Sequence, residues 1–231
     1  MTSIVSAQDL RRVYGEGGAA VTALDGVSVD FPAGRFTAIM GPSGSGKSTL
    51  MHLLAGLDRP TAGTVVLDGV ELTSLNDDAL TQLRRDRVGF IFQAFNLLPV
   101  LNARENIVLP MSIAGRDPED GWVDQLIDLV GLSDRITHRP SELSGGQQQR
   151  VAVVRALASR PAVVFADEPT GNLDSHASTE ILQLLRRSVD EFGQTIIMVT
   201  HDEEAAAYAD RLLVLRDGQI VEDRAPTTAV A

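Results

Sequence analysis

Short apolar or alternating runs follow one another along the chain, and turn residues separate them. Segments 4–13 and 21–31 carry alternating or β-branched residues, and this period of two predicts strands. Residues 64–72 predict a hairpin, because Asp68-Gly69 is a favoured two-residue turn. The first third of the chain is therefore predicted to be rich in β-structure.

Four further runs are short and almost wholly apolar. They lie at residues 36–40, 87–93, 162–167 and 195–200. Strands of a parallel sheet that is covered on both faces have this composition. Between the last two runs, residues 176–192 place Ile, Leu and Val side chains at helical spacing, which predicts a helix that packs on the sheet.

The stretch 95–157 differs from the rest of the chain. It has helical patterns at 122–130 and 147–159 but no convincing strand, so we expect a mostly helical insertion. Residues 212–222 predict a final hairpin around an Asp-Gly turn at 217–218.

Composition narrows the class of protein. The 231 residues suffice for one domain, or for one domain with an inserted subdomain. The net charge of −11 disfavours nucleic acid as a partner, because basic side chains supply most of that affinity. The densest basic group (Arg84, Arg85, Arg87) is predicted to lie on a solvated helix face.

Several absences point to a soluble cytoplasmic protein. Cysteine is missing, which suits a reducing compartment. The N-terminus lacks the layout of a signal peptide, and no apolar run approaches the ~20 residues needed to cross a bilayer.

The segment GPSGSGKS at 41–48 matches the P-loop pattern, between a predicted strand and a predicted helix. Glycines let backbone amides approach a phosphate, and the helix N-terminus adds positive charge. Lys47 can reach the β- and γ-phosphates, and the Ser48 hydroxyl can bind Mg²⁺. An ordinary glycine turn is the alternative, and the flanking elements disfavour it. The predicted phosphate-binding residues are Gly41, Ser43, Gly44, Ser45, Gly46, Lys47, Ser48 and Thr49.

Two adjacent carboxylates end the apolar run at 162–167. Asp167 is predicted to hold Mg²⁺ through water, at a strand end that points into the crevice. Glu168 is placed to orient and polarise the attacking water. Alone, the pair would be explained equally well by a charged turn after a strand. The P-loop upstream favours the metal site.

LSGGQ at 143–147 resembles the signature motif of ABC (ATP-binding cassette) ATPases, and it lies between the P-loop and the carboxylates as in that family. Gln93, Asp174 and His201 resemble the family's Q-loop glutamine, D-loop aspartate and switch histidine, and Tyr14 resembles the aromatic that stacks on adenine. The resemblance extends from residue 14 to about 222.

The resemblance implies an α/β fold. It would have a P-loop NTPase core with a mixed central sheet, an N-terminal antiparallel β subdomain and an inserted helical subdomain. Residues 1–231 would form a single domain, with the core at 1–94 and 158–231 and the helical subdomain at 95–157.

The resemblance also implies ATP and Mg²⁺ as ligands and a head-to-tail homodimer in the ATP-bound state. The signature of one copy would complete the ATP site of the other, through Ser144, Gly145, Gly146 and Gln147. Asp174 would lie at the boundary between the copies. Glu168, His201 and Lys47 would be catalytic, and Ser48, Gln93 and Asp167 would hold the metal.

Three longer segments (93–110, 166–175 and 199–220) resemble the macrolide-exporter and lipoprotein-releasing group of ABC ATPases. The group implies a separately encoded transmembrane permease as partner and a peripheral position on the inner face of the cell membrane. The apolar residues after Gln93 would line the groove that receives the permease, and they are Phe95, Leu97, Leu98 and Leu101.

Other functions stay open at this point. An ABC ATPase acting on DNA or ribosomes would usually have a coiled-coil insertion or two cassettes, and this chain has neither feature. A regulator of an extracytoplasmic enzyme would carry identical ATP chemistry. A degenerate scaffold is disfavoured because the catalytic residues are present.

Single residues also have simpler explanations. The pair His201-Asp202 could cap a helix that begins near residue 203. Tyr14 could be a packing residue at a strand end, and Gln93 alone is unremarkable. His52, His138 and His176 have no matching partners, so we assign them no metal role.

Overall fold

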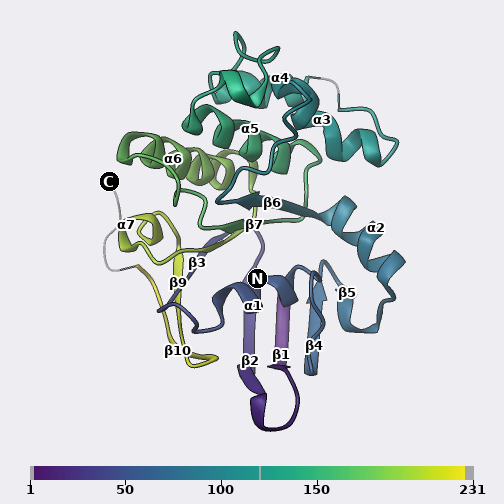
Figure 1. Ribbon diagram of the computed structural model, residues 1–231, viewed down its shortest axis with the longest axis vertical. Coiled ribbons are helices and arrows are strands. Elements are labelled where there is room, and N and C mark those ends of the chain that lie inside the picture. Colours follow the sequence, from purple (N-terminus) through teal and green to yellow (C-terminus); the bar gives the residue numbers. More distant parts are fainter. Residues whose placement is uncertain (1–2, 120, 227–231) are drawn as a thin grey trace.

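Two β-sheets and the helices between and above them make up the computed structural model, which describes residues 3–119 and 121–226 (Figure 1). The first sheet is antiparallel, with the order β2-β1-β4-β5. Its strands are β1 (Ser3–Tyr14), β2 (Val21–Pro32), β4 (Ala62–Leu67) and β5 (Val70–Glu71). The predicted β-rich first third and its hairpin at 64–72 are confirmed.

The second sheet has the order β10-β9-β3-β8-β7-β6. Five neighbouring strands are parallel, and β10 pairs with β9 in the antiparallel direction, so the predicted mixed sheet is confirmed. The strands are β3 (Phe36–Met40), β6 (Val88–Phe92), β7 (Val163–Asp167), β8 (Ile196–Val199), β9 (Arg211–Arg216) and β10 (Gln219–Arg224).

The apolar runs follow from burial on both faces of this sheet. In β7, Val164 and Ala166 belong to the core beneath the large helices. Their neighbours Val163 and Phe165 belong to the core that the antiparallel sheet and the first helix cover. Since apolar side chains cover both faces, residues 163–166 are all apolar, and the polar Asp167 stands only at the end of the strand.

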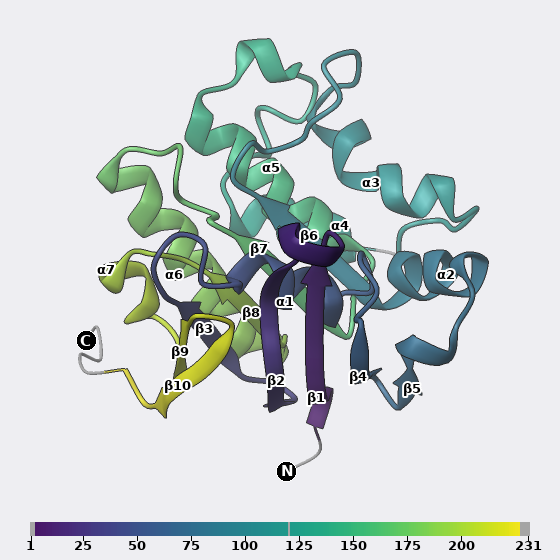
Figure 2. The same ribbon diagram turned by 60° about the horizontal axis from the view of Figure 1, so that its bottom comes forward.

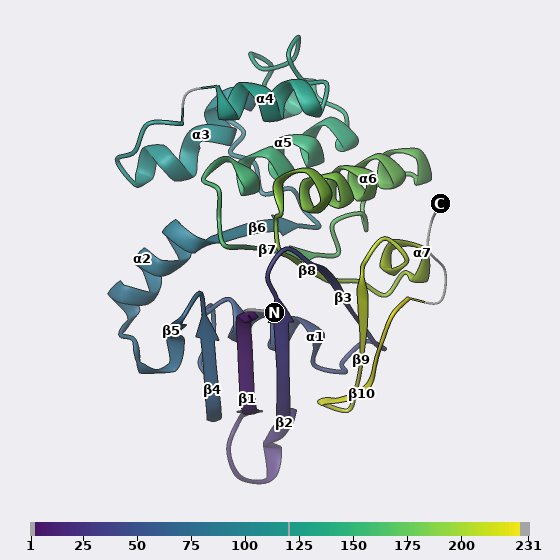
Figure 3. The ribbon, with the colours of Figure 1, turned by 180° about the vertical axis from the view of Figure 1, so that it is seen from behind.

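Seven α-helices lie in the described residues. They are α1 (Lys47–Leu54), α2 (Asp77–Arg87), α3 (Ala103–Ile113), α4 (Trp122–Leu129), α5 (Gly145–Ala158), α6 (Ser175–Phe192) and α7 (Glu203–Ala206). Helices α3, α4 and α5 lie at the end of the molecule opposite β1, β2 and β4 (Figures 1 and 3). No described helix is long and apolar enough to cross a membrane.

Helix α5 begins earlier than the predicted 147–159. Its N-cap is Ser144, whose Oγ accepts a hydrogen bond from the Gln147 amide at 3.3 Å. In return, Gln147 Oε1 accepts from the Ser144 amide at 2.9 Å. This capping box stabilises a first turn that contains Gly145 and Gly146, despite the low helix propensity of glycine. For α2 and α3, the hydrophobic pattern of the sequence predicted no first and last residue.

The two edge strands of the central sheet, β10 and β6, have different neighbours (Figure 2). Strand β10 lies on the same side of the molecule as α7, far from β5 of the antiparallel sheet. On the other side, β6 packs against α5, and Gly89 lies at the contact. A Cβ at Gly89 would come within 2.4 Å of the Ala156 carbonyl oxygen, a backbone atom that cannot rotate away.

We therefore predict that Gly89→Ala lowers the free energy of unfolding by about 1–3 kcal/mol, the usual effect of overpacking. Urea unfolding without nucleotide measures this change. Ser112→Ala, at an exposed position on α3, is the control and should leave the free energy of unfolding within about 0.5 kcal/mol of the parent. A Gly89→Ala protein as stable as the parent would contradict this account of the contact between β6 and α5.

Candidate functional site

The loop 41–48 joins β3 to α1, as predicted, and its backbone is packed tightly against two other segments. A Cβ at Gly41 would lie 2.1 Å from the Leu215 carbonyl oxygen, and one at Gly46 would lie 2.4 Å from the Ala23 carbonyl oxygen. Only glycine fits at these two positions. By contrast, a Cβ at Gly44 would meet nothing within 4 Å, so this part of the loop faces open space.

The turn between β9 and β10 braces the loop from outside. The Gly218 amide donates to the Ser45 carbonyl at 3.1 Å, and the Asp25 amide donates to the Gly218 carbonyl at 3.0 Å. The loop is therefore held by the final hairpin and by β2 of the antiparallel sheet. The predicted second turn at 217–218 thus has a role in the site that its sequence did not indicate.

Two polar side chains of the loop are almost buried. The Lys47 ammonium donates to the carbonyls of Gly41 and Pro42 at 2.8 and 2.9 Å. The Ser45 hydroxyl is buried and has no hydrogen-bond partner among the described residues. The open space beside Gly44, three residues before Lys47 at the N-terminus of α1, suits a bound phosphate group, because the helix N-terminus and the ammonium are both positively charged.

The carboxylates lie at the carboxyl end of β7, as predicted. Burial raises the pKa of Asp167, and the nearby Glu168 charge acts in the same direction, whereas His52 and Lys47 oppose it. Glu168 has a left-handed backbone with φ +46°, and its amide donates to the Val199 carbonyl at 2.9 Å. Such a conformation is uncommon outside glycine and often accompanies functional residues.

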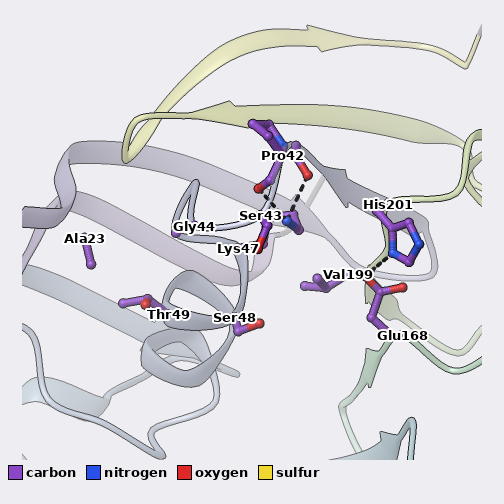
Figure 4. A pocket seen from close by; sticks show the side chains of 12 residues that line it. Ala23, Pro42, Ser43, Gly44, Lys47, Ser48, Thr49, Glu168, Val199 and His201 are labelled. Carbon is purple, nitrogen blue, oxygen red and sulfur yellow. Dashed lines mark hydrogen bonds and ion pairs between the residues drawn. The ribbon is translucent and has the colours of Figure 1, made fainter. Parts of the chain in front are cut away.

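His201 points at Glu168 (Figure 4). Its Nδ1 lies 2.8 Å from Glu168 Oε1, and this hydrogen bond raises the pKa of His201 above its usual value, with the Glu168 charge adding to the effect. The neighbouring Asp202 caps α7 by accepting from the Glu204 amide. The helix-cap explanation therefore applies to Asp202 and not to the His201 side chain.

A cleft of about 610 Å³ brings most of these groups together (Figure 4). Nine predicted site residues line it, and they are Gly41, Ser43, Gly44, Gly46, Lys47, Ser48, Thr49, Glu168 and His201. The sequence analysis missed three further lining residues. Pro42 lies inside the motif and Val199 at the end of an apolar run, so local signals existed for both. Ala23 comes from β2, and only the tertiary fold brings it to the cleft.

The remaining predicted residues are not among those that line the cleft. Gln93 and Asn172 form two hydrogen bonds. Gln93 Nε2 donates to Asn172 Oδ1 at 3.2 Å, and Asn172 Nδ2 donates to the Gln93 carbonyl at 3.0 Å. Ser144 caps α5, and Asp174 caps α6 by accepting from the Ala177 amide. Tyr14 donates to Asp58 at 2.8 Å and is not among the residues that line the cleft.

The donors at the cleft fit Mg²⁺. Ser48 lines the cleft and offers a hydroxyl oxygen. Asp167 is not among the lining residues, but its carboxylate lies near enough to Lys47 for the two charges to interact. A hydroxyl and a carboxylate are the hard oxygen ligands that Mg²⁺ takes. The described residues contain no cluster of three or more acidic, His or Cys side chains that could cage a metal. Mg²⁺ in phosphate sites does not need such a cage, because substrate phosphates and waters complete its shell.

Comparison with known proteins gives a consistent picture. Residues 24–171 match the family described as ABC transporter. A macrolide export ATP-binding/permease protein, MacB, of Bdellovibrio bacteriovorus is 48% identical over 98% of this chain and 36% of its own length. The chain thus spans about a third of the MacB relatives, with 34% for the one from Marinobacter nauticus.

Other relatives match over almost their whole length. An uncharacterized ABC transporter ATP-binding protein of Thermotoga maritima is 47% identical over 95% of this chain and 94% of its own. Among solved structures, the ATP-binding cassette MJ0796, described as a dimer in a post-hydrolysis state with ADP and Pi, is 40% identical. Its TM-score is 0.86, with 97% of this chain and 99% of that chain covered.

Three observations indicate the same family. They are the P-loop, the Glu168 and His201 side chains at the same cleft, and the family match over residues 24–171. The chain belongs to the ABC transporter family and is one of its ATP-hydrolysing cassettes.

Proposed function

We propose that two copies of this chain close head to tail around two Mg-ATP molecules and thereby drive a transmembrane permease of the export or mechanical-transmission type. One observation carries the proposal. The signature residues 144–147 form the N-terminus of α5, and none of them lines the chain's own cleft. A helix N-terminus with free amides binds anions. Its phosphate would therefore belong to a second copy.

Hydrolysis at the closed site would proceed by in-line attack of water on the γ-phosphorus. Glu168 accepts the proton of the attacking water, and the bond from the γ-phosphorus to the bridging oxygen of ADP breaks. Lys47 and His201 stabilise the negative charge that develops on the phosphoryl oxygens. Mg²⁺, held by Ser48, Gln93 and Asp167, would supply further charge neutralisation.

The relatives support the transport assignment. The MacB proteins are called export ATP-binding/permease proteins, and the MJ0796 cassette is described as dimeric. The Thermotoga maritima relative, which this chain covers almost fully, is called an ATP-binding protein alone. This supports a permease on a separate chain, with the cassette held at the inner face of the membrane through it. Tyr14 would stack on the adenine, and Asp174 would lie at the boundary between the copies.

The dimer is tested by light scattering on the Glu168→Gln protein. Without the base, Mg-ATP binds but is not hydrolysed, so we expect a shift from monomer to dimer that requires Mg-ATP. Ser144→Arg in the same background should abolish the shift, because the larger side chain would block the anion site of α5. Ser112→Arg, an exposed serine on α3, is the matched control and should dimerise normally. A protein that binds ATP and stays monomeric, or that dimerises despite Ser144→Arg, would sink the proposal.

His201 is tested by turnover. Replacing it with alanine removes a donor to the developing phosphoryl charge, so kcat should fall by about 10²–10³. Steady-state phosphate release measures this fall. Asp202→Asn is the control, because its carboxylate caps α7 and should affect turnover little. Equal kcat in His201→Ala and parent would remove His201 from the mechanism.

The pair between His201 and Glu168 makes a titration prediction. The pKa of His201 is raised above 6.5. The charged pair therefore stabilises the fold below that unfolded value, and its contribution is lost as the pH rises through the higher folded pKa. NMR titration of the imidazole should show a folded pKa above 6.5 that falls in Glu168→Gln. Asp202→Asn should lower it less, because Glu168 is the larger cause. An unchanged titration in Glu168→Gln would contradict the pairing.

A further inference from the structure

Two consecutive residues after Gln93 have left-handed backbones although neither is glycine. Phe95 has φ +57° and Asn96 has φ +51°. This region brings Cβ close to the following carbonyl oxygen, so L-residues visit it singly and seldom in succession. We call these two residues the 95–96 turn. Its conformation needs contacts from elsewhere in the fold to persist.

Arg155, on the signature helix α5, supplies such contacts. Its Nη2 donates to the Phe95 carbonyl at 2.9 Å, and its Nη1 donates to the Asn96 carbonyl at 2.6 Å. The planar guanidinium therefore binds both carbonyls of the turn at once, a geometry that its fork of donors suits. Within the described residues no charged side chain pairs with Arg155, and burial lowers the pKa of its guanidinium. Both hydrogen bonds that its side chain forms within the described residues go to the turn.

The turn also touches the signature motif and its neighbours. A Cβ at Gly145 would lie 3.7 Å from Phe95 Cζ and 3.7 Å from Leu173 Cδ2, so Gly145 lies next to both the Phe95 ring and the Leu173 side chain. On the other side, a Cβ at Gly171 would lie only 2.7 Å from Gln93 Nε2. The turn therefore lies where Gln93, the start of α5 and the residues before Asp174 meet.

We propose that Arg155 is a positioning residue for closure of the two copies. By binding the carbonyls of Phe95 and Asn96, it keeps the 95–96 turn left-handed, and the turn fixes the Gly145 end of α5 relative to Gln93. The signature residues 144–147 are then already in position to bind the phosphates of the second copy, and closure does not have to order them first. This assignment rests on the proposed function, because it places Arg155 in the ATP-dependent closure step.

Light scattering in the Glu168→Gln background tests the proposal. Arg155→Met keeps the apolar stem but removes both donors, so the Mg-ATP concentration for half-maximal dimer should rise about 5- to 30-fold. That range is the equilibrium equivalent of one residue's left-handed penalty. Binding of a fluorescent ATP analogue to the monomer should not change, because the P-loop is untouched.

The matched control is Arg150→Met, on the same helix. Arg150 pairs with Glu180 and donates to the Val130 carbonyl, so it braces α5 without contacting the turn. We expect lower stability in this variant but an unchanged half-maximal concentration. An unchanged value in Arg155→Met, or an equal rise in Arg150→Met, would overturn the proposal.

The substitution Asn96→Gly tests whether Arg155 acts by holding the turn or only by packing. Glycine adopts the left-handed region without a Cβ penalty, so Asn96→Gly should restore Arg155→Met to within about threefold of the parent. A purely structural role for Arg155 would not be rescued this way. Failure of the rescue, with normal closure in Asn96→Gly alone, would overturn the proposal. Should Arg155→Met not fold, Arg155→Lys keeps the charge without the two-pronged fork, and the same rescue applies.

Hydrogen exchange of the nucleotide-free monomer tests the contact without any dimer. Exchange over residues 94–98 should be about tenfold or more faster in Arg155→Met and unchanged in Arg150→Met. Equal exchange in Arg155→Met and parent would overturn the proposal. If Glu168→Gln itself does not dimerise, the proposed function fails, while the exchange still decides whether Arg155 holds the turn.

Discussion

The fold depends on the close approach of the P-loop backbone to two carbonyl oxygens, those of Leu215 and Ala23. Gly41 and Gly46 permit this approach, and it fixes the loop against the last hairpin and the antiparallel sheet. Segments far apart in the sequence thus meet at one short loop. Because the loop is ordered by the protein itself, phosphate binding needs little further ordering of the chain, which favours affinity.

The parts of the fold that follow local rules could be predicted from the sequence. Strands buried on both faces are recognisable as apolar runs, and the P-loop motif places a strand before it and a helix after it. The range of helix α3 was not predicted, because Pro110 lies inside it and proline disfavours a helix interior. The capping box of Asn102 and Glu105 was the signal that marks its start.

The site was predictable only as far as its residues carry local signals. Lys47, Glu168 and His201 come from three segments and line one cleft, as the motifs indicated. Ala23 and Arg155 could not be found in this way, because their roles come from tertiary contacts. An arginine ten residues into a helix looks like any solvated side chain until the fold brings two carbonyls to its guanidinium.

The left-handed backbone at Glu168 limits how this cassette can change over evolution. Glycine, Asn and Asp tolerate such a backbone, whereas β-branched residues avoid it strongly. A descendant that lost hydrolysis but kept the turn should therefore carry a residue of the tolerant kind at this position. Valine, isoleucine or threonine there would indicate that the backbone was rebuilt as well. The residue type at one position thus records whether a lineage lost only its chemistry or also the geometry that supported it.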